Sequence, residues 1–192
     1  MEVLFTKTTT ALVVIDLQKG ITAMPTQPYE AKSIIGNAAE LAEAFRKNKM
    51  PVFLVRVATS SDSKDRLQPI IDGENSWGKM QMPSDWSEIV PELGSSKGDI
   101  IITKKQWGAF YGTELDLQLR RRKIETIVLC GISTNIGVES TARFAFEYGY
   151  QQIFVEDAMS ARSAAEHEHT VQSTFPRMGR VRLAKDILAA LE

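Results

Sequence analysis

The stretch that decides the fold is Thr10-Ala-Leu-Val-Val-Ile-Asp16. Its five consecutive apolar residues, three of them β-branched, are typical of a strand that is buried on both faces of a sheet. Five similar short runs follow, at residues 51–57, 99–103, 126–130, 152–155 and 180–183. A sheet that is buried on both faces needs helices on both sides, so these runs predict a layered α/β domain.

Segments with helical spacing separate the predicted strands. The spacing predicts one long helix over residues 31–47 and shorter helices over 114–122, 134–148, 164–175 and 184–191. Strands that alternate with helices imply βαβ units with right-handed crossovers. The sequence therefore predicts a three-layer α/β/α fold around a doubly wound, mainly parallel sheet, with the active site beyond the carboxyl ends of the strands.

The length of the chain fits one domain. At 192 residues, the segment 1–192 is expected to fold as a single unit. Residues 58–98 interrupt the alternation with a long stretch rich in Ser, Asp, Gly and Pro that also contains Trp77 and Trp86. A connection of this length is uncommon in a compact domain and is usually functional or disordered, and two tryptophans argue against disorder. We expect a lid or a subunit contact there.

Composition excludes several classes of partner and site. The 23 Lys and Arg residues almost balance the 24 Asp and Glu residues, so no basic surface is expected to attract nucleic acid or an anionic membrane. There is no apolar run long enough for a membrane helix and no leader-like pattern at residues 1–10, which leads us to expect a cytoplasmic protein. The only cysteine is Cys130 and the only histidines are His167 and His169, so we expect no internal disulfide, no metal and no cofactor.

Two charged residues stand at the ends of predicted strands. Burial of Asp16 after the first strand would raise the pKa of its carboxyl, and a nearby cation would lower it. Lys104 follows the strand at 99–103 and can reach Asp16 if the strands are neighbours, although Lys105 competes because successive strand residues point to opposite faces. Without a catalytic role, Asp16 would cap a helix or turn and the lysines would be solvated.

The segment GISTNIGV at 131–138 joins a strand to a helix. Such a turn presents backbone N–H groups that suit an oxyanion or a carboxylate, while Thr134 or Asn135 can also cap the helix. Cys130 lies within the preceding apolar strand, where a buried thiol is usually inert. His167 and His169 lie two residues apart on a helix, hence on different faces, and are interpreted as surface or packing residues.

Three motifs resemble the isochorismatase-like hydrolase family, which includes isochorismatases, nicotinamidases and N-carbamoylsarcosine amidases. They are LVVIDLQ at 12–18, TKKQWGAFYGT at 103–113 and VLCGISTNIGVESTAR at 128–143, and the likeness extends through EDAMS at 156–160. The resemblance implies a doubly wound α/β/α fold that assembles into dimers or tetramers. It places the family's catalytic aspartate at Asp16, its catalytic lysine at Lys104 and a non-prolyl cis peptide at Ile132–Ser133.

The sequence departs from the amidase members of this family at one catalytic position. Gly137 stands where they carry the nucleophilic cysteine, so the usual acyl-enzyme cannot form. The histidine-containing metal motif of nicotinamidases is also absent. True isochorismatases are similar to this pattern, because they lack the cysteine and often have glycine there.

The resemblance therefore favours hydrolysis of a small-molecule vinyl ether or a related C–O bond. Asp16 would protonate the enol ether, which requires a neutral carboxyl, whereas Lys104 would favour the ionised form. Gly137 would leave room for the enolpyruvyl group, and turn N–H groups would hold negative oxygen. Substrate contacts are expected from residues beside these positions, although some of the aromatics can instead pack the core or a dimer contact. The expected contacts are Gln18, Trp107, Phe110, Ile132, Ser133, Thr134 and Asn135.

Two alternatives remain open. The first is an amide or carbamoyl hydrolase in which Asp16 is the base that activates water, Ser133 or Thr134. The second is a non-catalytic family member that binds a metabolite, an interpretation favoured by the missing thiol but opposed by the retention of Asp16 and Lys104.

Overall fold

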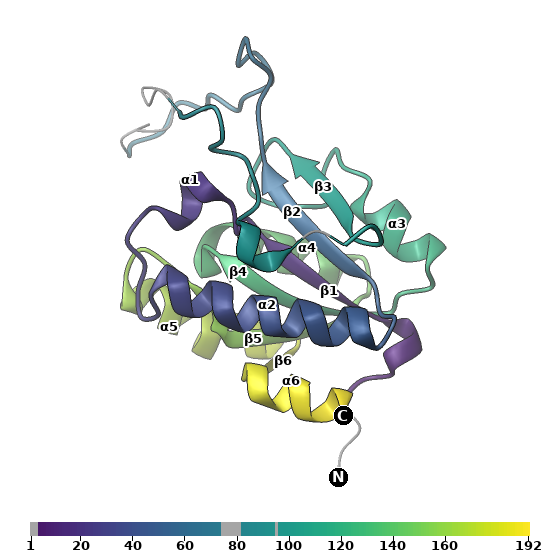
Figure 1. Ribbon diagram of the computed structural model, residues 1–192. Helices are drawn as coiled ribbons and strands as arrows, with labels where there is room; N and C mark the ends of the chain where they lie inside the picture. Colours follow the sequence, from purple (N-terminus) through teal and green to yellow (C-terminus); the bar gives the residue numbers. More distant parts are fainter. Residues whose placement is uncertain (1–3, 74–81, 95) are drawn as a thin grey trace.

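The computed structural model of the chain describes residues 4–73, 82–94 and 96–192 (Figure 1). Six strands form one parallel sheet in the order β3-β2-β1-β4-β5-β6. The strands are β1 (Thr10–Ile15), β2 (Val52–Val57), β3 (Ile100–Lys104), β4 (Thr126–Ile132), β5 (Gln151–Ser160) and β6 (Arg180–Arg182). The predicted α/β fold with a parallel sheet is therefore confirmed.

Helices cover both faces of this sheet. In Figure 1, α2 (Ala31–Lys47) and α6 (Ala184–Leu191) lie in front of the strands. The opposite face is covered by α3 (Leu115–Arg121), by α4 (Glu139–Glu147) and by the segment that follows α5 (Ala164–His169). No helix in the described part of the chain has the length and apolar character needed to cross a membrane.

The central strand β1 shows why this layering forms. Leu12 and Val14 pack into the core beneath α2 and α6, whereas Val13 and Ile15 pack into the core on the α3 and α4 side. Alternate strand residues point to opposite faces, so an unbroken apolar run supplies both cores at once. Every residue of β1 is buried.

Several elements differ from the sequence expectation. The predicted helix at 134–148 begins with a π-helical turn, η4 (Thr134–Val138), before α4, and the predicted helix at 164–175 divides into α5, η5 (Thr170–Thr174) and η6 (Phe175–Arg177). Strand β5 continues to Ser160, past the polar residues that suggested its end, because the β4–β5 pairing shifts register between Leu129 and Gly131. Three short elements were not predicted: η1 (Lys7–Thr9), α1 (Lys19–Thr22) and η3 (Pro91–Leu93).

The strand order places a topological switch point between β1 and β4. From β1 the chain moves outward to β2 and β3, and it then returns to β4 on the other side of β1. At such a switch point the connections leave in opposite directions, which opens a site at the carboxyl ends of the two strands. Asp16 follows β1 there, and the turn into η4 follows β4.

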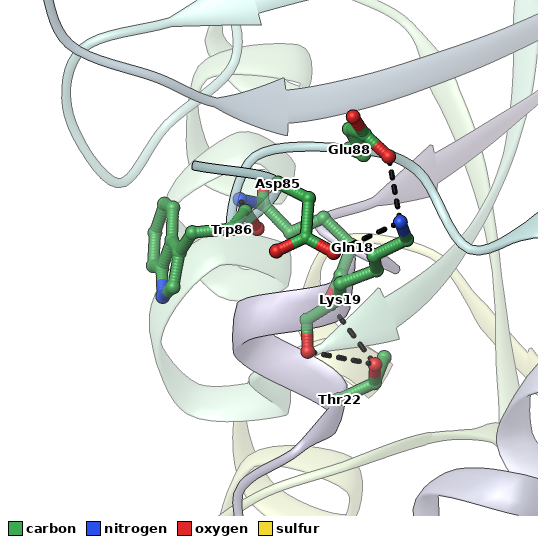
Figure 2. A network of polar contacts seen from close by, with 6 residues as sticks. All are labelled: Gln18, Lys19, Thr22, Asp85, Trp86 and Glu88. Atoms are coloured by element: carbon green, nitrogen blue, oxygen red, sulfur yellow. Dashed lines mark hydrogen bonds and ion pairs between the residues drawn. The ribbon is translucent and has the colours of Figure 1, made fainter. Parts of the chain in front are cut away.

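The end of the long excursion packs back onto the domain, as Figure 2 shows. Lys19 of α1 forms ion pairs with Asp85 at 3.0 Å and with Glu88 at 2.6 Å. A Cβ atom on Gly20 would lie 1.9 Å from the Trp86 ring, so this glycine permits direct contact with the indole. Residues 82–94 are therefore anchored to α1, whereas Trp77 lies outside the described residues.

The close approach of β1 and β4 gives a stability prediction. Gly131 has a φ of +119°, and a Cβ there would lie 2.0 Å from the Ile15 carbonyl oxygen. We expect Gly131→Ala to lower the free energy of unfolding by at least ~3 kcal/mol, because strain and a backbone clash combine. Urea denaturation measures this change.

Gly36 provides the matched control. It lies in α2, where an added Cβ atom would meet no other atom within 4 Å, so Gly36→Ala should raise stability by about 0.5–1 kcal/mol. Equal effects of the two substitutions would contradict the predicted backbone clash at Gly131.

Candidate active site

The structure brings Asp16 and Lys104 together. The Asp16 Oδ2 atom lies 2.6 Å from Lys104 Nζ, and only 7% and 2% of the two side chains are exposed. Lys104 ends β3 and Asp16 follows β1, with β2 between them, so the long lysine side chain spans the end of the middle strand. Lys104 Nζ also donates a hydrogen bond of 2.6 Å to the Trp107 carbonyl oxygen. Lys105 instead pairs with Asp65 at 2.8 Å.

Burial controls the protonation of this carboxyl. Desolvation raises the pKa of Asp16 to about 6, and the charge and hydrogen bond of Lys104 oppose part of that rise. Asp16 Oδ1 is buried and has no hydrogen-bond partner among the residues that the structure describes. The two carboxyl oxygens therefore differ, since one is held by an ammonium group and the other is buried without a hydrogen bond from the described residues.

Gly137 faces the same carboxyl. A Cβ atom on Gly137 would lie 3.0 Å from Asp16 Oδ2 and 3.1 Å from Ile15 Cγ2. Position 137, where the sequence resemblance implies a cysteine in the amidase members, thus adjoins the Asp16–Lys104 pair. Glycine at this position therefore lets the turn backbone pack closely against the Asp16 carboxyl and Ile15.

The turn between β4 and η4 leads to Gly137 beside the Asp16 carboxyl. The Ile132–Ser133 peptide bond is cis, and Ile132 is buried at the end of β4. The Ser133 carbonyl oxygen accepts hydrogen bonds of 3.1 Å from the N–H groups of Ile136 and Val138. Those two N–H groups are therefore already hydrogen-bonded within the turn. Fewer backbone N–H groups of this turn than expected are left to bind a negatively charged oxygen of a substrate.

The other expected contact residues have varied surroundings. Gln18 is buried, and its side-chain amide bonds to the backbone of Val57 and to the Trp86 carbonyl oxygen. Phe110 is also buried and packs its ring against Tyr148 and Tyr150. These contacts give Gln18 and Phe110 structural roles.

Trp107 and Asn135 differ from these two residues. The Trp107 side chain is 66% exposed, and only its carbonyl oxygen is seen to contact the Asp16–Lys104 pair. Asn135 has a buried Oδ1 atom that lacks a hydrogen-bond partner in the described parts of the chain. Asn135 therefore keeps an unused acceptor, whereas Trp107 contributes through its backbone.

Cys130 is not placed for nucleophilic chemistry. Its side chain is fully buried in the core beneath α2, and burial raises the pKa of the thiol to about 12. Such a thiol stays protonated and inert near neutral pH. In the segments that the structure describes, no three His, Cys, Asp or Glu side chains are grouped to hold a metal ion.

His167 makes a buried contact with Thr134 that the sequence did not indicate. His167 is buried and its Nδ1 atom lies 2.8 Å from Thr134 Oγ1, whereas His169 is exposed. Residues 134 and 167 are joined only by the tertiary fold, so no local pattern could reveal the pair.

Known proteins share both the sequence and this arrangement of strands. The isochorismatase domain matches residues 10–186. The chain is 53% identical over 179 residues to the isochorismatase family protein YwoC of Bacillus subtilis, covering 93% of this chain and 92% of YwoC.

Solved structures give the same result. An isochorismatase family protein from Burkholderia thailandensis has a TM-score of 0.93 at 44% identity, with 97% of each chain covered. N-carbamoylsarcosine amidase from Thermoplasma acidophilum has a TM-score of 0.75 at 31% identity, covering 91% of this chain and 96% of that one. The matching domain, the sequence identity and the shared fold together show that the chain belongs to the isochorismatase family of hydrolases.

Proposed function

We propose that the protein hydrolyses a vinyl ether or a related C–O bond of a small molecule, with Asp16 as the acid. The observation that carries this proposal is the buried Asp16 carboxyl, whose Oδ2 is held by Lys104 while its Oδ1 has no partner among the described residues. The raised pKa of Asp16 keeps a larger share of the carboxyl protonated than in water. A neutral carboxyl with a free oxygen is suited to donate a proton.

The proposed reaction begins with transfer of the Asp16 proton to the methylene carbon of the enol ether. An oxocarbenium ion forms, water adds to its carbon and returns a proton to Asp16, and the resulting hemiketal separates into a ketone and an alcohol. No protein nucleophile is needed, which agrees with glycine at position 137.

Lys104 has a defined part in this scheme. Before proton transfer it faces a neutral carboxyl, and after transfer it faces a carboxylate at 2.6 Å. Its attraction is therefore stronger in the transition state than in the ground state, which is the condition for a rate acceleration. A protonated Asp16 can therefore act as the acid even though a neighbouring ammonium group favours its ionised form.

An amide or carbamoyl hydrolase is the second candidate, because the fold and 31% of the aligned residues are shared with N-carbamoylsarcosine amidase. In that chemistry Asp16 would act as a base toward water, Ser133 or Thr134. Thr134 is fully buried, which keeps substrate away from its hydroxyl and disfavours it as the nucleophile. Assembly into dimers or tetramers stays a prediction for either function.

The two chemistries predict opposite pH dependences. With isochorismate as substrate and pyruvate release as the readout, kcat/KM should fall as the pH rises through about 6, because the proton donor is lost. Asp16→Asn should lower the rate by about 10²–10⁴-fold, while Asp65→Asn, at a partly exposed ion pair, should change it less than about twofold. Turnover of a carbamoyl substrate that increases through pH 6 would instead support the base mechanism.

Removal of the Lys104 charge should raise the pKa of Asp16 further. Lys104 lowers this pKa through its charge and its hydrogen bond, so Lys104→Met removes both effects. Carbon-13 NMR of the Asp16 carboxyl, assigned through Asp16→Asn, measures the titration. Lys105→Met is the matched control, because Lys105 pairs with Asp65, and it should leave the Asp16 titration unchanged.

A methyl group at position 137 should impair the reaction. In Gly137→Ala the Cβ would lie 3.0 Å from Asp16 Oδ2, closer than ordinary van der Waals contact, so the carboxyl must move. We expect a loss in kcat of about 10–100-fold, because small displacements of reacting groups have effects of this size. Steady-state kinetics with isochorismate check this, and an unchanged kcat would contradict a role for the close approach of position 137 to Asp16.

A further inference from the structure

His167 lies outside the Asp16–Lys104 pair, yet it contacts the turn that carries Gly137. Only 1% of His167 is exposed, and its Nδ1 atom lies 2.8 Å from the hydroxyl oxygen of Thr134, which is fully buried. Thr134 is the first residue of η4 and Gly137 is the fourth. The buried ring thus holds the beginning of the segment that faces the Asp16 carboxyl.

A second hydrogen bond joins the same two segments on the other side of Gly137. The Thr170 hydroxyl of η5 donates to Glu139 Oε2 at 3.0 Å. Residues 167 and 170 are near neighbours on one helical segment, and they contact residues 134 and 139. The segment that starts with α5 therefore clamps the turn at both ends.

Local sequence fixes the position of α5. Ser163 and Glu166 form a capping box, in which Glu166 Oε2 accepts a bond of 3.0 Å from the Ser163 N–H. This cap defines where the helix begins and so sets the face on which His167 lies.

The surroundings of His167 favour a neutral ring. Burial lowers its pKa, and the Glu168 charge on the same helix opposes that shift. The Tyr29 ring meets the imidazole edge-on at a centroid distance of 5.7 Å. His167 Nε2 is buried without a hydrogen-bond partner in the described segments, so the bond to Thr134 is the polar contact recorded for the ring.

We propose that His167 is a positioning residue, which fixes the turn carrying Gly137 against the Asp16 carboxyl through its hydrogen bond to Thr134. Loss of this bond would let the turn loosen, admit water to the carboxyl and disturb the close packing of Gly137 against Asp16. The catalytic consequence rests on the proposed function, whereas the effects on the turn and on Asp16 do not.

The test compares variants that remove the bond with variants that keep it. His167→Phe retains a ring of similar size without a polar atom, and His167→Asn places an amide near the position of Nδ1. Thr134→Val removes the hydroxyl at nearly constant volume, and Thr134→Ser keeps it. His169→Asn is the matched control, because His169 lies two residues away on α5 and is exposed.

Two readouts need no substrate. NMR hydrogen exchange of the Gly137 and Val138 amides should be at least ~10-fold faster in His167→Phe and Thr134→Val than in the wild type, since loosened segments exchange sooner. In the same variants the Asp16 pKa should fall from about 6 toward ~3.9, because water reduces the desolvation of the carboxyl. His167→Asn, Thr134→Ser and His169→Asn should stay close to the wild type.

The third readout is steady-state kinetics with isochorismate. A positioning role predicts a kcat loss of about 10–100-fold in His167→Phe, with KM changed less than about threefold. In the His167→Phe background, Thr134→Val should add little, because both substitutions remove one shared bond.

Defined results would overturn the proposal. If folded His167→Phe keeps the exchange rates and the Asp16 titration of the wild type, the bond does not position the turn. If His167→Asn is impaired as much as His167→Phe, ring packing is responsible. If His167→Phe does not fold, the Thr134→Val and Thr134→Ser pair decides the same question. Absence of isochorismate turnover in the wild type would refute the proposed substrate, and the exchange and titration results would still test the positioning role.

Discussion

The burial of one carboxylic acid against one amine is the constraint on which the site depends. Asp16 and Lys104 come from strands that are not adjacent, so their 2.6 Å contact requires three strand ends in register at one edge of the sheet. Removing either partner from such a buried pair leaves an uncompensated polar group in a low-dielectric region. The chain reverses its direction of sheet growth between β1 and β4, so Asp16 and Gly137 meet at this switch point, and β3 supplies Lys104 from the far side of β2. The fold therefore maintains the pair, and the pair in turn limits how the surrounding loops can pack.

The sequence was sufficient for the features that depend on local patterns. Apolar runs located the six strands, and their alternation with helical segments predicted the layers. Asp16 and Lys104 could be paired in advance because both follow predicted strands, although the choice between Lys104 and Lys105 needed the family resemblance. Polar residues were a poor guide to the end of a strand, since β5 continues through Glu156 and Asp157, which lie where the β4–β5 pairing changes register.

Side-chain surroundings could not be predicted in the same way. Gln18 and Phe110 stand close to Asp16 and Lys104 in the sequence, yet Gln18 hydrogen-bonds to two backbone segments and Phe110 packs in the core. His167 is the opposite case, because it lies far from Asp16 and Lys104 in the sequence but contacts the turn beside them. Its partner Thr134 is 33 residues away, and no local pattern links the two. Contacts of this kind depend on how helices that are distant in the sequence pack together, and this packing could not be predicted from one sequence.

The narrow gap between position 137 and Asp16 also limits which residues position 137 can accommodate. A side chain introduced there would meet Asp16 Oδ2 at 3.0 Å and Ile15 Cγ2 at 3.1 Å before any reactive atom was placed. Any larger residue at position 137 therefore requires a small shift of Ile15 or Asp16. The identity of residue 137 is thus coupled to the packing at the carboxyl end of β1, and a change at one of these positions alters what the other can accommodate.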